Sequence, residues 1–308
     1  MKSVSVTATR LSVPCLLLLA AGFAPRANAE EYTKSYPVTG RAIVHVQVDD
    51  SSVRVITSDT HQVDFNVKNE GSETFNVGGK LHIDSQQNGN EVELTVLRKP
   101  GITIGFSNRH LSTEVHMPMN ADLQIETTDG SVEVSSVNGS VTIHTTDGAV
   151  KAAQLAGKVE IRTTDGSINV DALTGESKMH STDGSIAVAH FDGKCDASTT
   201  DGSIHVGGRF DSLDVKSVDG SVVARVTPGS KMSDAWGIRT SDGSIELALP
   251  HDFQANLDAS TRDGHITLGL PVEVQGNIGK TAVRGTMNGG GPTLTIHTGD
   301  GSIQIKSI

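Results

Sequence analysis

An Asp-Gly pair recurs with an 18-residue period through the middle of this sequence and constrains its fold more than any other feature. The regular pairs begin at Asp129, Asp147, Asp165, Asp183, Asp201 and Asp219. Three later pairs begin at Asp242, Asp263 and Asp300, at intervals of 23, 21 and 37 residues. A fixed period of this length is typical of repeat proteins in which each unit packs on its neighbours. The sequence therefore predicts a solenoid.

Apolar residues keep fixed offsets from each Asp, and these offsets predict two strands per repeat. At +3 stand Val132, Val150, Ile168, Ile186, Ile204 and Val222, and at +5 stand Val134, Ala152, Val170, Val188, Val206 and Ala224. Positions +12 and +14 are also mostly apolar, whereas +4 and +13 are mostly polar. Alternation with a period of two indicates strands with one buried face.

The two strands of each repeat predict the architecture. A glycine at +10 separates them, at Gly139, Gly157, Gly175 and Gly193, so each 18-residue rung consists of two nine-residue halves. We therefore expect an all-β fold, a single-chain parallel β-solenoid. We expect it to be right-handed, because parallel crossovers are right-handed in nearly all proteins. Rungs stacked about 4.8 Å apart would give the five regular repeats a length of roughly 24 Å.

The Asp-Gly pair is expected to form the turn between rungs. Glycine can adopt positive φ where a chain reverses, and an Asp side chain can accept hydrogen bonds from the backbone N–H groups that follow it. Hydroxyl residues at +16 would stack beside this turn: Thr145, Thr163, Ser181, Thr199 and Ser217. The aspartates are therefore interpreted as turn-forming residues.

Calcium binding is the alternative role for the stacked aspartates. Calcium-binding β-rolls also have nine-residue halves, with glycine-rich turns that contain a double glycine. This chain lacks the double glycine, and a single aspartate per rung offers few oxygen ligands to an ion of high coordination number. The prediction is no cofactor and no metal site, with calcium kept as the alternative.

Residues 1–29 have the pattern of a secretory signal peptide. A basic start is followed by an apolar run from Leu11 to Gly22 and by Ala27-Asn28-Ala29, a small-x-small cleavage pattern. The run is too short to span a bilayer, and no second long apolar run follows it, so we expect no stable membrane insertion. The predicted location is outside the cytoplasm, either periplasmic or extracellular at the cell surface.

The remaining chain divides into two predicted regions. Residues 30–118 contain irregular alternating segments, which indicate an irregular N-terminal β region that caps the solenoid. Residues 119–308 contain the regular solenoid with its Asp-Gly repeats. The last strands, around Leu294 and Ile303, are expected to close the stack, after a degenerate repeat near residues 280–282.

Charge and composition exclude several kinds of partner. The signal peptide holds three basic residues and no acidic one, so its removal leaves 22 basic against 36 acidic residues, a net charge of −14. Nucleic acids and anionic membranes need a basic surface, so neither is expected as a partner. Aromatic residues make up 3% of the chain, which indicates a core stacked from small aliphatic residues.

Three features of this sequence resemble a bacterial family. Tyr36-Pro-Val-Thr-Gly40, the repeated Thr-Thr-Asp-Gly-Ser-Ile and the ending from Met287 to Ile305 are similar to the "putative adhesin" β-strand-repeat proteins, an exported domain of unknown function. The resemblance covers roughly residues 36 to 306. It implies an exported β-solenoid of adhesin-like type and implies no catalytic residues.

An enzyme that acts on polysaccharides is the alternative function. Glycosidases need two carboxylates about 5–9.5 Å apart. Asp196 and Asp214 share the outward +13 offset one rung apart, which places them near this range. Surface acids are common in so acidic a chain, and no aromatic platform accompanies this pair, so no catalytic residue is predicted.

Other chemically active residues have structural interpretations. His144 and His180 share the +15 offset but lie two rungs apart, about 9.6 Å, which is too far for one metal ion. Cys195, the single cysteine after the signal peptide, takes the inward +12 offset and is interpreted as a core residue.

The repeat fails most clearly between Asp219 and Asp242, where five extra residues surround the chain's only tryptophan, Trp236. Insertions in solenoids form loops on one face, often the binding face. Trp236 is therefore the candidate ligand-binding residue, and packing over the core is the alternative. Together these observations predict an exported, non-enzymatic, adhesin-like β-solenoid, a structural or binding scaffold of the cell envelope whose ligand is unknown.

Overall fold

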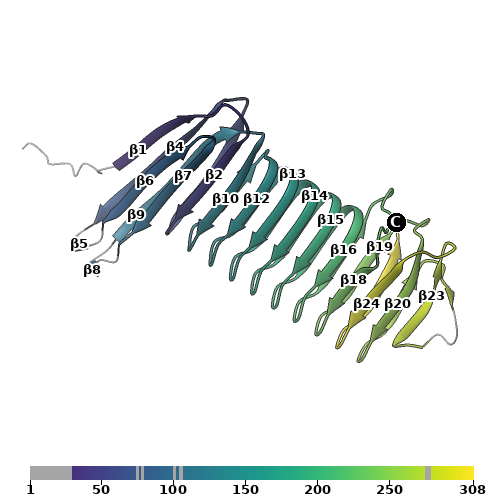
Figure 1. The fold of residues 1–308 in the computed structure, drawn as a ribbon. Coiled ribbons are helices and arrows are strands. Elements are labelled where there is room, and N and C mark those ends of the chain that lie inside the picture. Colours follow the sequence, from purple (N-terminus) through teal and green to yellow (C-terminus); the bar gives the residue numbers. More distant parts are fainter. Residues whose placement is uncertain (1–29, 74–75, 78–79, 100–101, 104–106, 275–278) are drawn as a thin grey trace, which may run out of the picture.

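A computed structural model describes residues 30–308 except 74–75, 78–79, 100–101, 104–106 and 275–278. The predicted signal peptide lies outside the described residues. Every regular element of the described chain is a β-strand, and 23 strands join in one mostly parallel sheet that stays open at both ends (Figure 1). The predicted fold class, an all-β solenoid, is confirmed.

The regular rungs are built from strands that pair in parallel with their counterparts in the adjacent rung. These strands are β10 (Ala121–Thr127), β11 (Val132–Ser135), β12 (Asn138–His144), β13 (Val150–Arg162), β14 (Ile168–His180), β15 (Ile186–Ser198) and β16 (Ile204–Lys216). Val150 pairs with Ile168, and Ile168 pairs with Ile186. The register that the Asp offsets predicted is therefore the register of the sheet.

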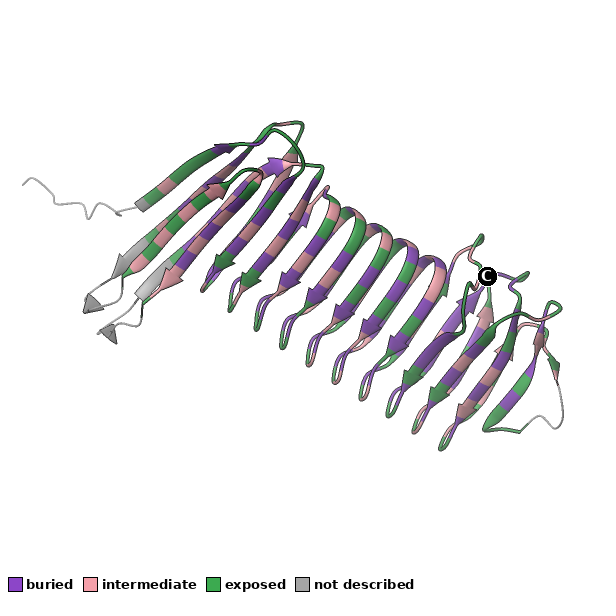
Figure 2. Ribbon diagram, viewed as in Figure 1, coloured by how far each residue is buried: buried purple, intermediate pink, exposed green. Residues whose placement is uncertain are grey.

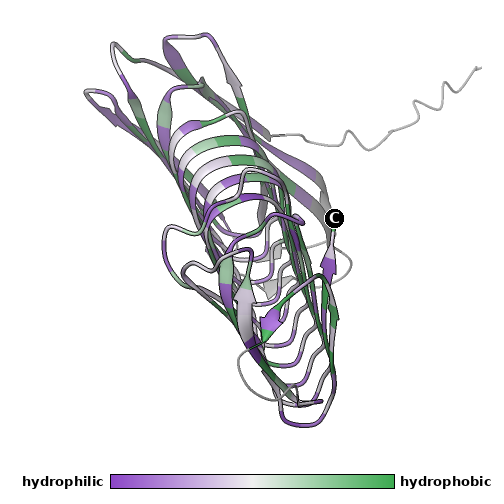
Figure 3. Cartoon of the chain, turned by 90° about the vertical axis from the view of Figure 1, so that its right-hand side faces the viewer, coloured by the Kyte–Doolittle hydropathy of each residue, from purple (hydrophilic) through white to green (hydrophobic). Residues whose placement is uncertain are grey.

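Each of the strands β13 to β16 turns a corner within its own length. In three of them the +7 residue, Gln154, Ala172 or His190, has φ between 52° and 59°. The corner thus lies at +7, three residues before the +10 glycine that sequence patterns indicated. We call the sheet of +3 to +6 positions the N-half wall and the sheet of +8 to +15 positions the C-half wall. Figure 3 shows the two walls nearly end-on as a flattened coil.

The core lies between the two walls and consists of the inward offsets. Positions +3, +5, +12 and +14 are buried in the regular rungs, and the alternation is visible along each strand in Figure 2. The +8 position adds a fifth column at the corner, with Val137, Leu155, Leu173 and Phe191. Stacking of the rungs therefore buries nearly all of the aliphatic residues of the repeat.

The N-terminal region contains both a rung and a cap. Its strands are β1 (Glu30–Pro37), β2 (Ala42–Val48), β3 (Ser51–Ser58), β4 (Gln62–Glu73), β6 (Leu81–Asn88), β7 (Glu91–Arg98) and β9 (Ser107–Pro118), with β5 (Asn76–Val77) and β8 (Ile102–Thr103) as a separate pair. Strand β2 lies between β7 and β10, and β3 lies between β9 and β11. The antiparallel strands β1, β4 and β6 form the outer end.

The C-terminal region repeats this arrangement. Its strands are β17 (Val222–Val226), β18 (Trp236–Thr240), β19 (Ile245–Leu249), β20 (Ala255–Thr261), β21 (Ile266–Gly269), β22 (Glu273–Val274), β23 (Ala282–Met287), β24 (Thr293–Thr298) and β25 (Ile303–Ser307). Strand β24 lies between β18 and β20, and β25 lies between β19 and β21 (Figure 1).

The last repeat therefore does not close the stack, which corrects the expectation from sequence. It is the penultimate rung, and the end is formed by β20 and β21 with the antiparallel strands β23 and β22. The expected degenerate repeat near residues 280–282 is also wrong, because that segment leads into antiparallel β23. The long interval between Asp263 and Asp300 arises since the chain forms this cap before it returns.

Candidate binding surface

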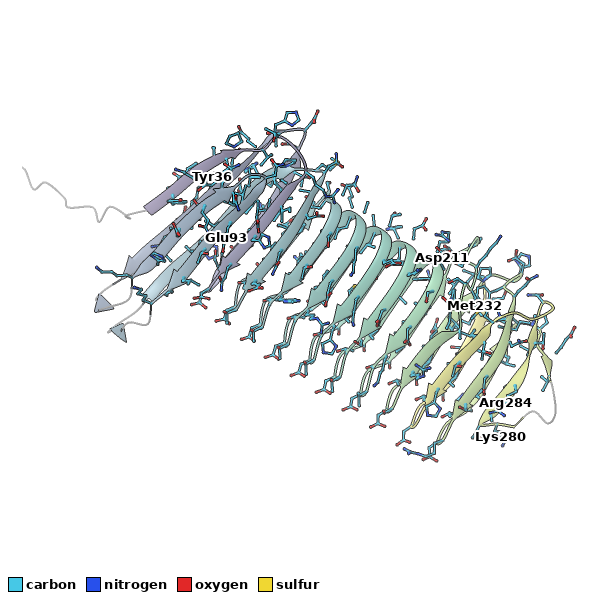
Figure 4. All side chains as sticks on the ribbon, in the orientation of Figure 1. Tyr36, Glu93, Asp211, Met232, Lys280 and Arg284 are labelled. Carbon is cyan, nitrogen blue, oxygen red and sulfur yellow. The ribbon has the colours of Figure 1, made fainter. Side chains whose placement is uncertain are left out.

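The turn edge of the solenoid carries a ladder of aspartates. Backbone bonds between successive turns place the aspartates in the order Asp50, Asp129, Asp147, Asp165, Asp183, Asp201, Asp219, Asp242, Asp300 and Asp263. Side chains with carboxylate tips follow this edge in Figure 4. The pKa of Asp129 is raised, first by its hydrogen bond with Asp50, then by desolvation, and then by the charges of Asp50 and Asp147. The ladder is thus a line of like charges.

The hydroxyls, and not the aspartates, form the turn. Thr163 Oγ1 accepts a hydrogen bond from Gly166 N at 3.0 Å and donates to Thr146 O at 3.1 Å, and Ser181 Oγ accepts from Gly184 N at 2.9 Å. These hydroxyls are buried. Within the described chain, no carboxylate of the regular ladder bonds to the turn backbone, so the expected Asx turn is wrong. The aspartates face solvent instead.

The turn glycine is required by close contact and not by positive φ. A Cβ at Gly184 would lie 1.9 Å from Gly166 O, and the same contact recurs in the neighbouring rungs. The glycines with φ near 130° are those at +10: Gly157, Gly175 and Gly193. The glycine of the Asp-Gly pair therefore allows consecutive turns to stack one sheet spacing apart.

The C-half wall presents charges that pair with one another across rungs. Lys194 Nζ lies 2.9 Å from Glu176 Oε1, and the pKa of Glu176 is lowered by this hydrogen bond. In the neighbouring +13 column Glu160, Lys178 and Asp196 follow one another in register. Signs alternate along the +11 column from Lys158 to Lys194 and along the +13 column from Glu160 to Asp196, so much of the charge in these rungs is neutralised within the wall.

The N-half wall holds a groove that crosses the rungs. Its volume is about 520 Å³, and it is lined by the +4 to +6 positions of successive rungs, from Glu133 to His205. Small residues at the outward +4 and +6 positions form much of its surface: Ala153, Ala187 and Ala189. It runs across strands and along the solenoid axis, over roughly four rung spacings of 4.8 Å, or about 19 Å.

Polar groups line both sides of this groove. At +4, Glu133 is paired with Arg54 at 2.9 Å, whereas Lys151 has no ion pair within the described residues. Near the corner, His190 Nδ1 lies 2.7 Å from Asp171 Oδ1, and both side chains are exposed. The groove thus has an apolar floor of small side chains and a rim of mixed hydrogen-bonding groups with little net charge.

Trp236, the candidate ligand-binding residue, lies inside the core. It is 1% exposed, packs edge-on against Phe210 at 6.2 Å between ring centroids, and contacts Phe253 at 5.3 Å. Its indole N–H donates to Asp211 O at 3.4 Å. A side chain so enclosed cannot contact an external ligand, so the ligand-binding hypothesis for Trp236 is replaced by the packing alternative.

The five extra residues before Trp236 form an exposed loop over the corner. Lys231 N donates to Phe210 O at 3.1 Å, and Ser233 N donates to Asp211 O at 3.0 Å. Asp211 and Met232 lie close together at this edge in Figure 4. The insertion therefore replaces one corner turn and covers the aromatic column beneath it.

The carboxylates of the alternative enzyme hypothesis are neighbours. Asp196 and Asp214 are paired residues of β15 and β16, and both are exposed. The pKa of Asp196 is raised by desolvation and then by Asp214, while Lys178 opposes this shift. Asp214 also lies 3.4 Å from Arg239. A shallow recess of about 430 Å³ includes both carboxylates together with Lys178 and Lys194.

The remaining candidates have the positions that sequence indicated. Cys195 is buried, and burial raises the pKa of its thiol to about 12. His144 and His180 both pair with Arg162, which lies between them in the sheet. Across the described ranges of the chain, no group of three or more His, Cys, Asp or Glu side chains is arranged to hold a metal ion.

These features define the protein as an all-β, parallel β-solenoid with a turn-edge aspartate ladder and an axial groove. The chain belongs to the Toastrack DUF4097 family, whose model matches residues 43–306. No match was found among curated proteins.

Three solved structures are similar to this chain at low identity. A "putative adhesin" of Bacteroides fragilis shares 12% identity with a TM-score of 0.39, covering 91% of this chain and 97% of that one. A "putative adhesin" of Parabacteroides merdae shares 8% with a TM-score of 0.34, covering 92% and 98%. A "putative cell adhesion protein" of Clostridium sporogenes shares 12% with a TM-score of 0.23, covering 91% and 100%.

Among the described residues, no helix has the length and apolar character needed to cross a bilayer.

Proposed function

We propose that this chain is an exported, non-enzymatic, adhesin-like scaffold of the cell envelope. In this proposal it binds a linear, uncharged polysaccharide of an envelope or cell surface along the groove of the N-half wall. The observation that carries the proposal is the groove itself, which crosses successive rungs and is lined by small side chains from Glu133 to His205. A groove along the axis suits an extended polymer.

Charge supports an uncharged ligand. The chain carries a formal net charge of −11, and many of its carboxylates form a continuous line along the turn edge, so a polyanion would be repelled. Around the groove, Glu133 and Asp171 are already paired with Arg54 and His190. The unpaired polar groups that remain, such as Lys151, can form hydrogen bonds with sugar hydroxyls, while the alanines contact the apolar face of a sugar ring.

Export supports placement in the envelope. The pattern of residues 1–29 is that of a secretory signal peptide, and cleavage after Ala29 would release the chain into the periplasm or to the cell surface. The fold needs no disulfide there, because only Cys195 follows the signal peptide.

A glycan array probed with residues 30–308 tests the proposal. Binding to uncharged linear polysaccharides is expected, and Ala153→Trp or Ala189→Trp, which would fill the groove, should remove it without lowering the melting temperature. Lys178→Trp on the C-half wall is the matched control and should bind normally. Normal binding by both groove variants, or no binding by the unaltered protein to any linear glycan, would contradict the proposal.

A second function, polysaccharide cleavage, is favoured by one observation. Asp196 and Asp214 are exposed neighbours, and the raised pKa of Asp196 is a property that a general acid needs. Incubation with linear polysaccharides and measurement of new reducing ends tests this function. If the protein releases reducing ends, and Asp196→Asn and Asp214→Asn each abolish this release, the protein is an enzyme and not a binding scaffold.

A further inference from the structure

The rung formed by β24 and β25 is separated from its spatial neighbours along the chain. It pairs on one side with β18 and β19 and on the other with β20 and β21 (Figure 1). In the regular rungs each unit stacks on the units directly before and after it. Here residues 293–307 lie between the rung of β18 and β19 and the rung of β20 and β21, although residues 250–254 connect these two rungs directly along the chain. The rest of the chain thus forms a slot that this segment fills.

The slot is specific for a segment of this kind. It offers unpaired strand backbone on both sides and core space for the four apolar residues Leu294, Ile296, Ile303 and Ile305, all fully buried. Thr298 Oγ1 donates to Gly243 O at 2.7 Å. A Cβ at Gly301 would lie 2.2 Å from Gly243 O. The slot therefore accepts a strand pair with alternating apolar residues, a hydroxyl before the turn and a glycine in it.

The connection to this rung is a glycine-rich hinge, residues 288–292. Asn288, Gly289 and Gly290 all have φ between 49° and 85°, and nothing lies within 4 Å of a Cβ placed on Gly289. Asn288 Nδ2 is anchored by bonds of 2.9 Å to His251 O and Phe253 O. Torsions after this anchor can therefore redirect the following strands without a change in β23.

We propose that residues 293–307 are an exchangeable donor segment, and that the slot accepts the same segment of a second copy of this chain. The second copy is the partner because it carries the sequence that the slot selects. Exchange preserves each backbone pairing and buried side chain of the slot, so the open connection is the only new element. Copies that exchange in a head-to-tail manner form chains, which would multiply any binding surface that each copy carries.

Within one chain, the tethered segment competes with exchange. A short flexible tether gives an effective concentration on the order of 1 mM, so dilute protein should be monomeric. A shorter hinge shifts this balance, because β23 and β24 lie on opposite sides of β20 and the hinge must pass around that strand. Deletion of Gly289 and Gly290 leaves three residues for this path and should favour exchange.

Cysteine pairing between copies tests the proposal. One copy carries Arg239→Cys and the other His297→Cys, both in a Cys195→Ala background. Residues 239 and 297 are exposed partners on β18 and β24, at a spacing that suits a disulfide. Mixed at high concentration and oxidised with oxidised glutathione, they should give several-fold more covalent dimer than a control mixture of His297→Cys with Lys151→Cys.

Two further variants make each outcome decisive. A single chain with both cysteines should oxidise internally, which shows that the positions can join. The hinge-shortened chain should form dimers or larger oligomers by light scattering and cross-link almost fully between copies. If the double variant oxidises but neither mixture exceeds the control, with or without the shortened hinge, the proposal is overturned. A shortened chain that remains a folded monomer also overturns it.

Discussion

Within each turn, the hydroxyl residue, the glycine and the aspartate have three different roles, whereas the sequence pattern predicted that the aspartate forms the hydrogen bonds of the turn. The hydroxyl at +16 is buried and joins consecutive turns, as Ser181 does by accepting from Gly184 N and donating to Gly166 O. The glycine is required by its distance to the previous turn. The aspartate between them is exposed and contributes charge. The repeated motif is therefore a structural turn whose acidic residue is available for other interactions.

Two opposite substitutions in neighbouring rungs test this division. Gly184→Ala should lower the free energy of unfolding by about 2–4 kcal/mol, because the new Cβ would lie 1.9 Å from Gly166 O. Ala172→Gly should raise it by up to about 1 kcal/mol, because Ala172 has φ of 59°. Urea denaturation measures both changes. A neutral Gly184→Ala would show that the turns can separate without cost.

The aspartate ladder should make stability depend on pH and salt. The pKa of Asp165 is raised by desolvation and by the charges of Asp147 and Asp183. The folded state therefore binds a proton more readily than the unfolded state, and this contribution to unfolding free energy falls as pH rises above the unfolded value of 3.8.

Asp165→Asn removes one of these like charges. We expect a small rise in melting temperature at neutral pH and low salt, which vanishes in high salt and at pH values below the titration of the ladder. Thermal scans at two salt concentrations measure the effect. Asn169→Asp, which adds a carboxylate away from the ladder, is a control for net charge. A lower melting temperature for Asp165→Asn at low salt would mean that the ladder is stabilising.

At the residue scale the sequence predicts which side chains point inward, but it does not predict which side chain forms the hydrogen bonds of the turn. The inward offsets follow from alternation, which is a local pattern. The choice between Asp165 and Thr163 as the turn-capping group depends on which oxygen faces the preceding turn, and that depends on the corner at Ala172 and on the stacking distance. Neither quantity can be derived from residue type.

At the level of elements, the insertion before β18 covers a column of stacked aromatic side chains, and the two features occur together. Phe191 stacks on Phe210 at 5.5 Å, and Trp236 and Phe253 continue the column. Aromatic rings replace the aliphatic corner residues of earlier rungs where the repeat length changes. The extra volume fills the wider interior, which explains why the chain's only tryptophan lies beside its largest irregularity.

Trp236→Ala distinguishes packing from binding. We expect a loss of about 3–5 kcal/mol in the free energy of unfolding, as for other large buried residues. Lys231→Ala in the exposed loop should change it little. Urea denaturation with tyrosine fluorescence or circular dichroism reports both. Retained stability of Trp236→Ala would show that the loop, and not the ring, supports the corner.

The positions of the two rungs next to the caps could not be predicted from sequence. Residues 42–58 and 293–307 have the same alternation as any rung, so the pattern identifies them as strands but does not specify their neighbours. Their place in the stack depends on which other strands leave an edge free, and this depends on the antiparallel strands β4, β6 and β23, which cover the outer edges of β9, β7 and β20. Such long-range pairing is determined by the whole fold.

For the whole molecule, charge order on the C-half wall gives each rung a preferred neighbour. At +11, Lys158, Glu176 and Lys194 follow one another in register, and at +13 Glu160, Lys178 and Asp196 alternate as well. The backbone and core are nearly identical from rung to rung, so these outer columns oppose a shift of one rung. Like charges directly opposite each other in a sheet are destabilising.

Deletion of single rungs tests this idea, because two such deletions bring different charges together. They also remove different core residues, Ser177 and Met179 in one and Val159 and Ile161 in the other, so the effect of charge is taken from the salt dependence of stability. Removal of residues 165–182 places Lys158 beside Lys194 and Glu160 beside Asp196. Removal of residues 147–164 creates no such pair at +11 or +13. Both chains should fold, because the core columns and the turn remain in register, and both should lose a similar amount of buried surface.

The two like-charge contacts of the first deletion should lower its stability at low salt by about 0.5–1 kcal/mol relative to high salt, whereas the second deletion should show no such loss. Urea denaturation gives the free energies, and equal m-values would show that the two chains expose the same surface on unfolding. High salt should remove only the contribution of these pairs, because they are exposed. An equal salt dependence of the two chains would mean that the core alone sets the order of rungs, and that the alternating charges of the C-half wall serve contacts outside the chain.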